Sequence, residues 1–283
     1  MSFVAFILTH NRPDKVFTYK TLRNQGYTGK IILVIDNEDP SADKYYEKYG
    51  KENVYMFDKL AISKTFDTAD TSDDRRAIVY ARNACFSIAK ELGYDYFLEL
   101  DDDYLKFEHR RIENNKFKTK PISNLDKVFE AFVDFLENTN TKSIAFCQGG
   151  DFIGGVTNKR TQEGLLRKAM NSFFCKTDRP FTFVGRINED VNTFTSLAQQ
   201  GDLFFSYTSA MLRQKQTQTN SGGMTDIYLD TGTYVKSFYT VIFSPSCTKI
   251  SSMGDAHHRI HHQINGDLCY PKILSEEVKY GRK

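Results

Sequence analysis

The sequence of 283 residues lacks the cysteine pairs that mark disulfide-bonded or zinc-binding domains. Its cysteines are few, far apart and without a CxxC pair: Cys85, Cys147, Cys175, Cys247 and Cys269. An odd number at such spacing is typical of reduced, buried thiols in a cytosolic protein. We therefore expect a cytoplasmic location, which for a viral protein would be the host cytoplasm.

Long hydrophobic runs are also absent. No apolar stretch approaches the roughly 18 residues that a membrane-spanning helix needs, so no membrane partner is expected. The N-terminal MSFVAFILTHNRP contains a short apolar run, but no basic residues precede it and no small-residue cleavage site follows it. We expect a strand there rather than a signal peptide.

The sequence has no strong excess of either charge. Its 38 basic and 36 acidic residues leave a net charge of +2, which argues against a strongly basic nucleic-acid clamp. What it has in abundance is apolar and aromatic residues, with 23 Phe and 16 Tyr. This composition predicts a sizeable core and excludes a disordered chain.

Near-continuous apolar stretches separated by helical patterns organise the first hundred residues. We expect strands at 3–9, 30–36, 53–57 and 95–100, and a helix at 73–92 that Ser72 caps and Gly93 ends. Strands that are apolar throughout indicate a sheet that is covered on both faces. The pattern predicts an α/β fold with a mostly parallel central sheet flanked by helices.

The rest of the chain continues without a visible domain boundary, so we expect a single domain over residues 1–283. A helix is expected at 123–138, with Ser123 and Asp126 as a capping box, and another at 189–200. Between them a strand from residue 143 runs into a glycine-rich loop. Its glycines indicate turns or a close backbone approach to a ligand: Gly149, Gly150, Gly154 and Gly155.

Polar residues follow three of the predicted strands, as THNR, DNED and DDDY. The carboxyl ends of parallel strands meet at one edge of a sheet, where ligands bind. Asp101 and Asp103 lie two residues apart on an extended chain and point to the same side, so both can contact one cation. Mg²⁺ and Mn²⁺ prefer such oxygen ligands and often bind phosphate oxygens as well. A solvated acidic turn is the alternative interpretation.

Two segments carry a family resemblance. Residues 80–104, YARNACFSIAKELGYDYFLELDDDY, resemble the ARN-helix-strand-DxD segment of glycosyltransferases with the GT-A fold. Residues 185–207, GRINEDVNTFTSLAQQGDLFFSY, are similar to the xED element of the same family. The resemblance implies a GT-A-like, Rossmann-like domain with a nucleotide-binding half (1–105) and an acceptor-binding half (106–283). It also implies sugar transfer from a nucleotide-sugar donor, most simply a UDP-sugar, to an acceptor hydroxyl.

In that family the DxD aspartates hold a Mn²⁺ or Mg²⁺ ion that bridges the donor diphosphate. The resemblance implies that Asp103 is the main metal ligand, Asp101 a metal or ribose contact, and Asp102 the variable middle residue near the substrate. It implies the following donor contacts: Thr9, Asn11, Arg12, Asp36 and Arg82. Ordinary alternatives are a surface charge at Arg12 and a turn at Asp36.

The second segment carries the acid pair Glu189 and Asp190, which Asn188 could cap as the start of a helix. Helix formation alone would explain acids there, because the helix dipole stabilises negative charge at its N-terminus. The resemblance implies a catalytic pair instead, in which Asp190 orients or deprotonates the acceptor hydroxyl. A retaining enzyme would not need that base.

Four of the six histidines lie in MGDAHHRIHHQ, residues 253–263. The pairs His257/His261 and His258/His262 have the i, i+4 spacing that would let a helix chelate a metal. A separate zinc site and a solvated histidine patch are two interpretations. The resemblance implies a third, in which His261 or His262 is the last ligand of the divalent metal.

The segment KFEHRRIENNKFKTKP, residues 106–121, carries six basic residues against two glutamates. It is either a solvated loop or a contact for an anionic acceptor. GT-A-like enzymes include those that glycosylate hydroxymethylpyrimidine bases of phage DNA, so modified DNA is one acceptor that the resemblance implies.

Two rival functions are weaker. A nucleotidyltransferase would carry a glycine-rich phosphate loop after the first strand, and THNRPDK has no glycine. A non-catalytic nucleic-acid-binding protein fits poorly with the near-neutral charge.

Overall fold

The computed structural model describes residues 2–158, 162–215, 235–253 and 259–281. Its main sheet has ten strands in the order β3-β2-β1-β4-β9-β7-β10-β5-β6, with β8 paired to β10. These strands are β1 Phe3–Leu8, β2 Lys30–Asp36, β3 Val54–Phe57, β4 Tyr96–Asp101, β5 Tyr104–Glu113, β6 Lys116–Pro121, β7 Ser143–Cys147, β8 Leu165–Leu166, β9 Phe173–Lys176 and β10 Phe204–Gln214. A second sheet pairs β11 Thr248–Met253 with β12 Arg259–Ile264.

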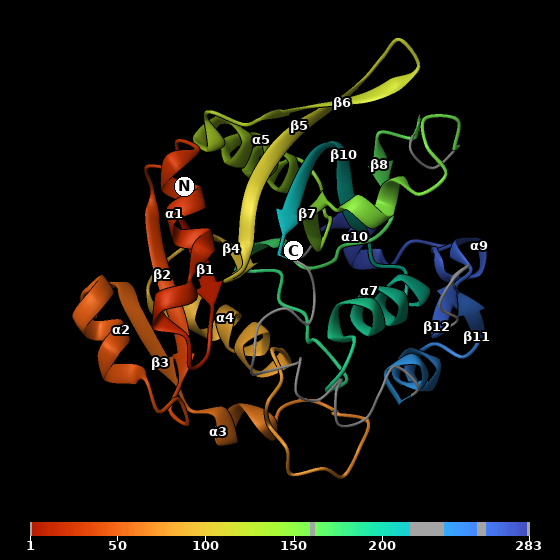
Figure 1. Cartoon of the computed structure of the whole chain (residues 1–283). Helices are drawn as coiled ribbons and strands as arrows, with labels where there is room; N and C mark the ends of the chain where they lie inside the picture. Colours follow the sequence, from red (N-terminus) through yellow and green to blue (C-terminus); the bar gives the residue numbers. More distant parts are fainter. Residues whose placement is uncertain (1, 159–161, 216–234, 254–258, 282–283) are drawn as a thin grey trace.

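The direction of the strands brings three of their carboxyl ends together. Strands β3, β2, β1 and β4 run parallel, and so do β7 and β10 (Figure 1). Strand β9 pairs antiparallel with both β4 and β7 and so lies between the two groups. The register places Leu8 beside both Val34 and Asp101, so β1, β2 and β4 end at one edge of the sheet.

Helices cover both faces of the sheet over two hydrophobic cores. Residues of α4 and α7, such as Cys85 and Phe194, pack in one core. Residues of α1, α2 and α5, such as Leu22, Tyr45 and Phe129, pack in the other. The predicted fold class, a mostly parallel central sheet flanked by helices, is therefore confirmed. The described helices are η1 Pro13–Lys15, α1 Phe17–Asn24, α2 Ala42–Tyr49, η2 Lys51–Asn53, α3 Lys59–Ser63, α4 Val79–Glu91, α5 Leu125–Glu137, η3 Gly149–Phe152, α7 Glu189–Gln199, α9 Gly266–Cys269 and α10 Glu276–Tyr280.

Two predicted helix starts are wrong. Helix α4 begins at Val79 instead of residue 73, because side chains upstream bind their own backbone. The Oγ of Ser72 accepts the N–H of Asp74 at 3.1 Å, and such local bonds compete with helix formation. Helix α5 is capped by Asn124, whose Oδ1 accepts the N–H of Lys127, rather than by a Ser123 box.

The basic segment 106–121 is a hairpin and not a loop. Strands β5 and β6 pair from Glu108 opposite Pro121 to Glu113 opposite Lys116. Asn114 and Asn115 join them with φ of 50° and 54°, and a two-residue turn with positive φ at both positions suits the twist of a hairpin.

The five cysteines are unpaired and buried, as the sequence predicts. Among the described residues, no helix is long and apolar enough to cross a membrane.

Candidate active site

The three aspartates at the end of β4 are held in place by α1 and by the end of β1. The hydroxyl of Thr18 donates to the carbonyl oxygen of Asp101 at 2.6 Å and accepts the N–H of Tyr104 at 2.9 Å. The N–H of Thr18 also donates to the carbonyl oxygen of Asp102. The turn that presents the aspartates is therefore fixed through its backbone, which leaves the carboxylates to make separate contacts.

Asp102 faces the end of β1 and is buried. Its Oδ2 accepts a hydrogen bond from the hydroxyl of Thr9 at 2.7 Å and lies 3.1 Å from Nε of Arg12. Burial raises the pKa of Asp102 to about 6, although Arg12 and Thr9 oppose that rise. Three of the predicted substrate contacts, Thr9, Arg12 and Asp102, thus form one connected group.

Asp103 is the least engaged of the three carboxylates. Within the described part of the chain, it forms no ion pair with a basic side chain. Burial, and then the charges of Asp101 and Asp102, raise the pKa of Asp103 to about 7, while Arg12 opposes them. Like charges this close favour a cation between them, so Asp103 is the carboxylate best placed to receive one.

Asp101 is tied to a buried arginine. Its Oδ1 lies 3.0 Å from Nη2 of Arg82, whose side chain is 1% exposed. Nε of Arg82 lies 3.0 Å from Oε1 of Glu189, and its Nη1 lies 3.5 Å from Oε2 of Glu99. Burial would lower the pKa of Arg82, but these three carboxylates raise it, so the guanidinium keeps its charge. The structure therefore places Arg82 among the acidic groups, beneath the surface of the site.

Glu99 is a residue of this network that the sequence interpretation missed. It precedes Asp101 by two residues on β4 and is fully buried. Neither of its carboxylate oxygens makes a hydrogen bond to a described residue. Burial raises its pKa to about 8, although Arg82 opposes the rise. An acid inside the apolar run YFLEL was the available signal, because alternate strand residues share a face.

The pair Glu189 and Asp190 opens α7 and is buried beside Asp101. Burial and the charge of Asp190 raise the pKa of Glu189 to about 7, while Arg82 lowers it. Burial also raises the pKa of Asp101, and the charge of Asp190 adds to that rise. The acids from the end of β4 and from the start of α7 therefore belong to one site.

Asn188 does not cap α7 with its side chain, contrary to the prediction. It has a left-handed backbone with φ of 57° and makes no side-chain bond to the helix. Its amide instead donates to the carbonyl oxygen of Lys236 at 2.8 Å and lies 3.4 Å from Nδ1 of His262. Asn188 thus connects the acid pair to the C-terminal histidines.

The histidine segment is extended where the structure describes it. His261 and His262 lie on β12, so the helix that an i, i+4 chelate would need does not form there, and His257 and His258 lie outside the described residues. Burial, with His261 and Lys236, lowers the pKa of His262 to about 4, which leaves its imidazole neutral. No group of three or more His, Cys, Asp and Glu in metal-binding geometry occurs in the described ranges.

The remaining predicted donor contacts lie at the ends of β1 and β2. Asp36 is buried, with its carboxylate 2.8 Å from Nδ1 of His10 and 3.3 Å from Nζ of Lys59. Burial raises the pKa of Asp36, but these two partners lower it below its ordinary value. Asn11 is exposed, and its N–H donates to Oδ2 of Asp39 at 2.7 Å. The sequence interpretation missed His10 and Lys59 as neighbours of this carboxylate.

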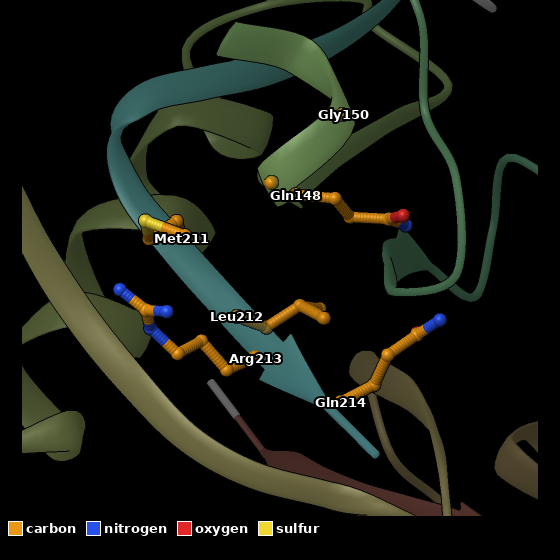
Figure 2. Close-up of a pocket in the computed structure, with 7 residues that line it drawn as sticks. Gln148, Gly150, Met211, Leu212, Arg213 and Gln214 are labelled. Carbon is orange, nitrogen blue, oxygen red and sulfur yellow. The ribbon is translucent and has the colours of Figure 1, made fainter. Parts of the chain in front are cut away.

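A cavity of about 280 Å³ lies where β7 and β10 end. It is lined by Gln148, Gly149, Gly150, Met211, Leu212, Arg213 and Gln214 (Figure 2). Figure 2 shows the side chains of Gln148 and Gln214 extending to the same side of β10. A Cβ added to Gly149 or Gly150 would meet nothing within 4 Å.

The cavity is connected to the acidic site through its neighbours. Oε1 of Gln214 accepts from the amide of Asn171 at 2.9 Å, and the carbonyl oxygen of Asn171 lies 3.3 Å from Nη2 of Arg82. The N–H of Lys215, which follows Gln214, donates to the carbonyl oxygen of Asp103. The cavity therefore adjoins the acidic site at Asp103.

A family model described as TET-associated glycosyltransferase matches residues 3–223. The chain belongs to the TET-associated glycosyltransferase family. The match spans both acidic segments and ends before β12. Family membership favours a glycosyltransferase over the nucleotidyltransferase and over the non-catalytic nucleic-acid-binding protein.

Solved structures similar to this TET-associated glycosyltransferase share little sequence with it. One is glucosyl-3-phosphoglycerate synthase from Mycobacterium tuberculosis in complex with Mn²⁺, UDP and phosphoglyceric acid, with 8% identity and a TM-score of 0.46 over 95% of this chain and 89% of that chain. Another is S. aureus TarS 1–349 in complex with UDP-GlcNAc, with 14% identity and a TM-score of 0.41 over 86% of this chain and 71% of that chain. No curated protein sequence matches the chain.

Proposed function

We propose that this TET-associated glycosyltransferase moves a sugar from a nucleotide-sugar donor, a UDP-sugar in the simplest case, to an acceptor hydroxyl with the aid of Mn²⁺ or Mg²⁺. The observation that carries the proposal is the arrangement of Asp103 beside Asp101, at the carboxyl edge of the sheet and close to the start of α7. Among the described residues, Asp103 forms no ion pair with a basic side chain, whereas Asp101 and Asp102 are each paired with an arginine.

The donor set fits a hard divalent cation. Asp101 and Asp103 supply carboxylate oxygens. Burial raises the pKa values of both, the charges of Asp101 and Asp102 add to the rise at Asp103, and a bound cation would relieve that repulsion. Neutral His262, beside Asn188, is proposed as a further ligand, with His261 as the alternative; either would have to approach the aspartates, because the described residues hold no group of three such side chains in metal-binding geometry. When bound, the metal would offset the charge of the donor diphosphate as it leaves.

The donor nucleotide is proposed to lie over the ends of β1 and β2. The polar groups there, Thr9, Asn11, Arg12 and Asp36, can face a ribose, a base or a phosphate. Arg82 is assigned a different role from the one that the resemblance implies. Because its guanidinium is buried among carboxylates, it holds Asp101 and Glu189 in position instead of contacting the nucleotide.

Asp190 is the proposed base of an inverting reaction. It would accept the proton of the acceptor hydroxyl as that oxygen attacks the sugar, while the bond between the sugar and the diphosphate breaks. Glu189 is the other member of the proposed catalytic pair. Its carboxylate already lies 3.0 Å from Nε of Arg82, so Glu189 is less free than Asp190 to take a proton.

The proposed acceptor is a hydroxymethylated pyrimidine in DNA. Support comes from the basic residues of the β5–β6 hairpin, which begins directly after Asp103 on a chain whose net charge is only +2. Unpaired, buried cysteines support a reducing, cytoplasmic setting, in the host if the protein is viral.

Thermal-shift measurements with a panel of nucleotide sugars, with and without Mn²⁺, test the donor and the metal together. A ligand that binds only the folded chain raises the melting temperature, so one donor should raise it in the presence of Mn²⁺ and much less in EDTA. The same donor should then add one sugar to an oligonucleotide that contains 5-hydroxymethylcytosine, as measured by mass spectrometry. The absence of any donor-dependent shift would contradict the proposal.

A further inference from the structure

The β5–β6 hairpin begins at the acidic site and ends far from it. Strand β5 starts at Tyr104, next to Asp103, and runs ten residues to Glu113 before the turn at Asn114 and Asn115 (Figure 1). At about 3.3 Å per strand residue, the tip lies roughly 30 Å from Asp103. No single small acceptor can contact both places.

One face of this hairpin is almost entirely basic. The register places His109 opposite Lys120, Arg111 opposite Lys118, and Glu113 opposite Lys116. Paired strand residues point to the same side, so these six share one face, and all six are exposed. We call His109, Arg111, Lys116, Lys118 and Lys120 the basic face. Glu113 is the exception, and it pairs with Arg111 at 2.8 Å.

The opposite face of the hairpin braces it against the body of the protein. The guanidinium of Arg110 lies 3.6 Å from the ring centre of Phe117 and 3.2 Å from that of Phe152. Phe152 ends η3, whose first residues, Gly149 and Gly150, line the cavity beside the acidic site. The hairpin is therefore an arm that is braced at Arg110 and Phe117, and β5 pairs with cavity-lining residues of β10 nearer its base.

Protection of an edge strand against aggregation is a simpler explanation for the three lysines of β6, which forms the end of the sheet. It does not account for the inner strand, where Arg111 lies directly opposite Lys118. Like charges in opposite positions destabilise a pair of strands. Glu113 offsets part of that cost through its contact with Arg111, and an anion bound across the two strands would offset the rest.

We propose that the basic face is a remote contact for a double-stranded DNA acceptor, reached only by a duplex long enough to span from the acidic site to the hairpin. This rests on the proposed DNA acceptor. A duplex rises about 3.4 Å per base pair, so roughly ten base pairs cover the distance. A two-stranded ribbon is also narrow enough to enter the major groove.

The test compares duplexes of six and twenty base pairs, each with one 5-hydroxymethylcytosine near an end. The parent enzyme should show a KM for the long duplex that is at least about tenfold lower than for the short one. The variant Lys116→Glu/Lys118→Glu/Lys120→Glu should lose this difference and keep both its kcat and its KM for the short duplex. The glutamates keep the edge strand charged. If the lysines served only to protect that edge from aggregation, the variant would keep the difference in KM between the two duplexes.

A matched control carries the same charge change on exposed lysines elsewhere: Lys51→Glu/Lys90→Glu/Lys279→Glu. Its KM values should follow those of the parent. Equal KM values for both duplexes in the parent, or equal losses in the two triple variants, would overturn the remote contact.

A binding measurement separates this inference from the proposed function. Fluorescence anisotropy with an unmodified duplex of twenty base pairs needs no turnover. The parent should bind it with an affinity that falls as the salt concentration rises. In the hairpin variant, the slope of log affinity against log salt concentration should be shallower by about 0.9 for each phosphate contact removed.

If the parent and both variants bind alike, the hairpin inference fails even where sugar transfer to DNA is observed. If hairpin-dependent binding is seen without transfer, the proposed acceptor fails and the contact is supported. Tighter hairpin-dependent binding of duplex RNA would overturn DNA as the occupant.

Discussion

Nε of Arg82 lies 3.0 Å from Oε1 of Glu189, a contact that joins α4 to α7 across 107 residues of sequence. The same guanidinium holds Asp101 at the end of β4. One buried cation therefore sets the relative positions of the two acidic segments that family resemblance marks as functional. Arg82 contacts Asp101 and Glu189, whereas Asp103 and Asp190 form no ion pair with a basic side chain in the described part of the chain.

Replacing Arg82 with Met should destabilise the protein by about 3–5 kcal/mol, because it leaves buried carboxylates without their cation. Arg82→Lys should cost less, since it keeps the charge but loses the planar fork that contacts several groups at once. Urea denaturation of both variants at pH 7.5 measures the two free energies. A free energy of unfolding in Arg82→Met within about 0.5 kcal/mol of the parent would show that the network contributes little to stability.

Asp103→Asn should remove sugar transfer and Mn²⁺-dependent donor binding without lowering stability. The raised pKa of Asp103 reflects burial and repulsion by its neighbours, so a neutral amide relieves repulsion at pH 8. Asp102→Asn is the matched contrast: it weakens buried bonds to Thr9 and Arg12 and should cost about 2–3 kcal/mol. Isothermal titration with Mn²⁺ and donor, combined with thermal melts, distinguishes the two. Normal transfer by Asp103→Asn would exclude Asp103 as the metal ligand.

Asp190→Asn should lower kcat by about 10²- to 10⁴-fold while donor affinity is unchanged, as expected for the loss of a general base. Glu189→Gln should instead act mainly on stability, because it breaks the contact with Arg82. Steady-state kinetics with the acceptor in excess measures the first effect and chemical denaturation the second. A parent-like kcat in Asp190→Asn would indicate a reaction that needs no base at this position.

The Glu99→Gln variant should become more stable relative to the parent protein as the pH rises. The pKa of Glu99 is about 8 in the folded chain against an ordinary 4.5, so the folded state binds its proton more tightly than the unfolded state. The stability that this proton contributes is complete below pH 4.5 and is lost as the pH rises toward 8. The difference between the free energies of unfolding, variant minus parent, should therefore rise by more than about 1 kcal/mol between pH 5 and pH 8.

Guanidinium denaturation in metal-free buffer at pH 5, 6.5 and 8 provides the comparison. Other groups with raised pKa values, such as Asp102, are present in both proteins and cancel in the difference. A constant difference across these pH values would mean that Glu99 titrates normally.

Local patterns predicted much of the sheet and its acidic edge. The apolar runs at 3–9, 30–36 and 95–100 correspond closely to β1, β2 and β4, because buried parallel strands need apolar residues on both faces. The polar residues that follow them meet at one edge because parallel strands place their carboxyl ends together. Errors occurred where side chains bound nearby backbone, as at Ser72 and Asn124.

What the sequence determined by itself is therefore the fold class, the position of the acidic turn at Asp101–Asp103, and the family. Only the tertiary structure decided which partner each acid contacts. The contacts of Arg82 with Glu189 and of Asn188 with His262 join residues that are far apart in the chain, and no local periodicity encodes such pairs. The ion pairs then distinguish the carboxylates: Asp102 contacts Arg12, Asp101 and Glu99 contact Arg82, and Asp103 pairs with no basic side chain among the described residues.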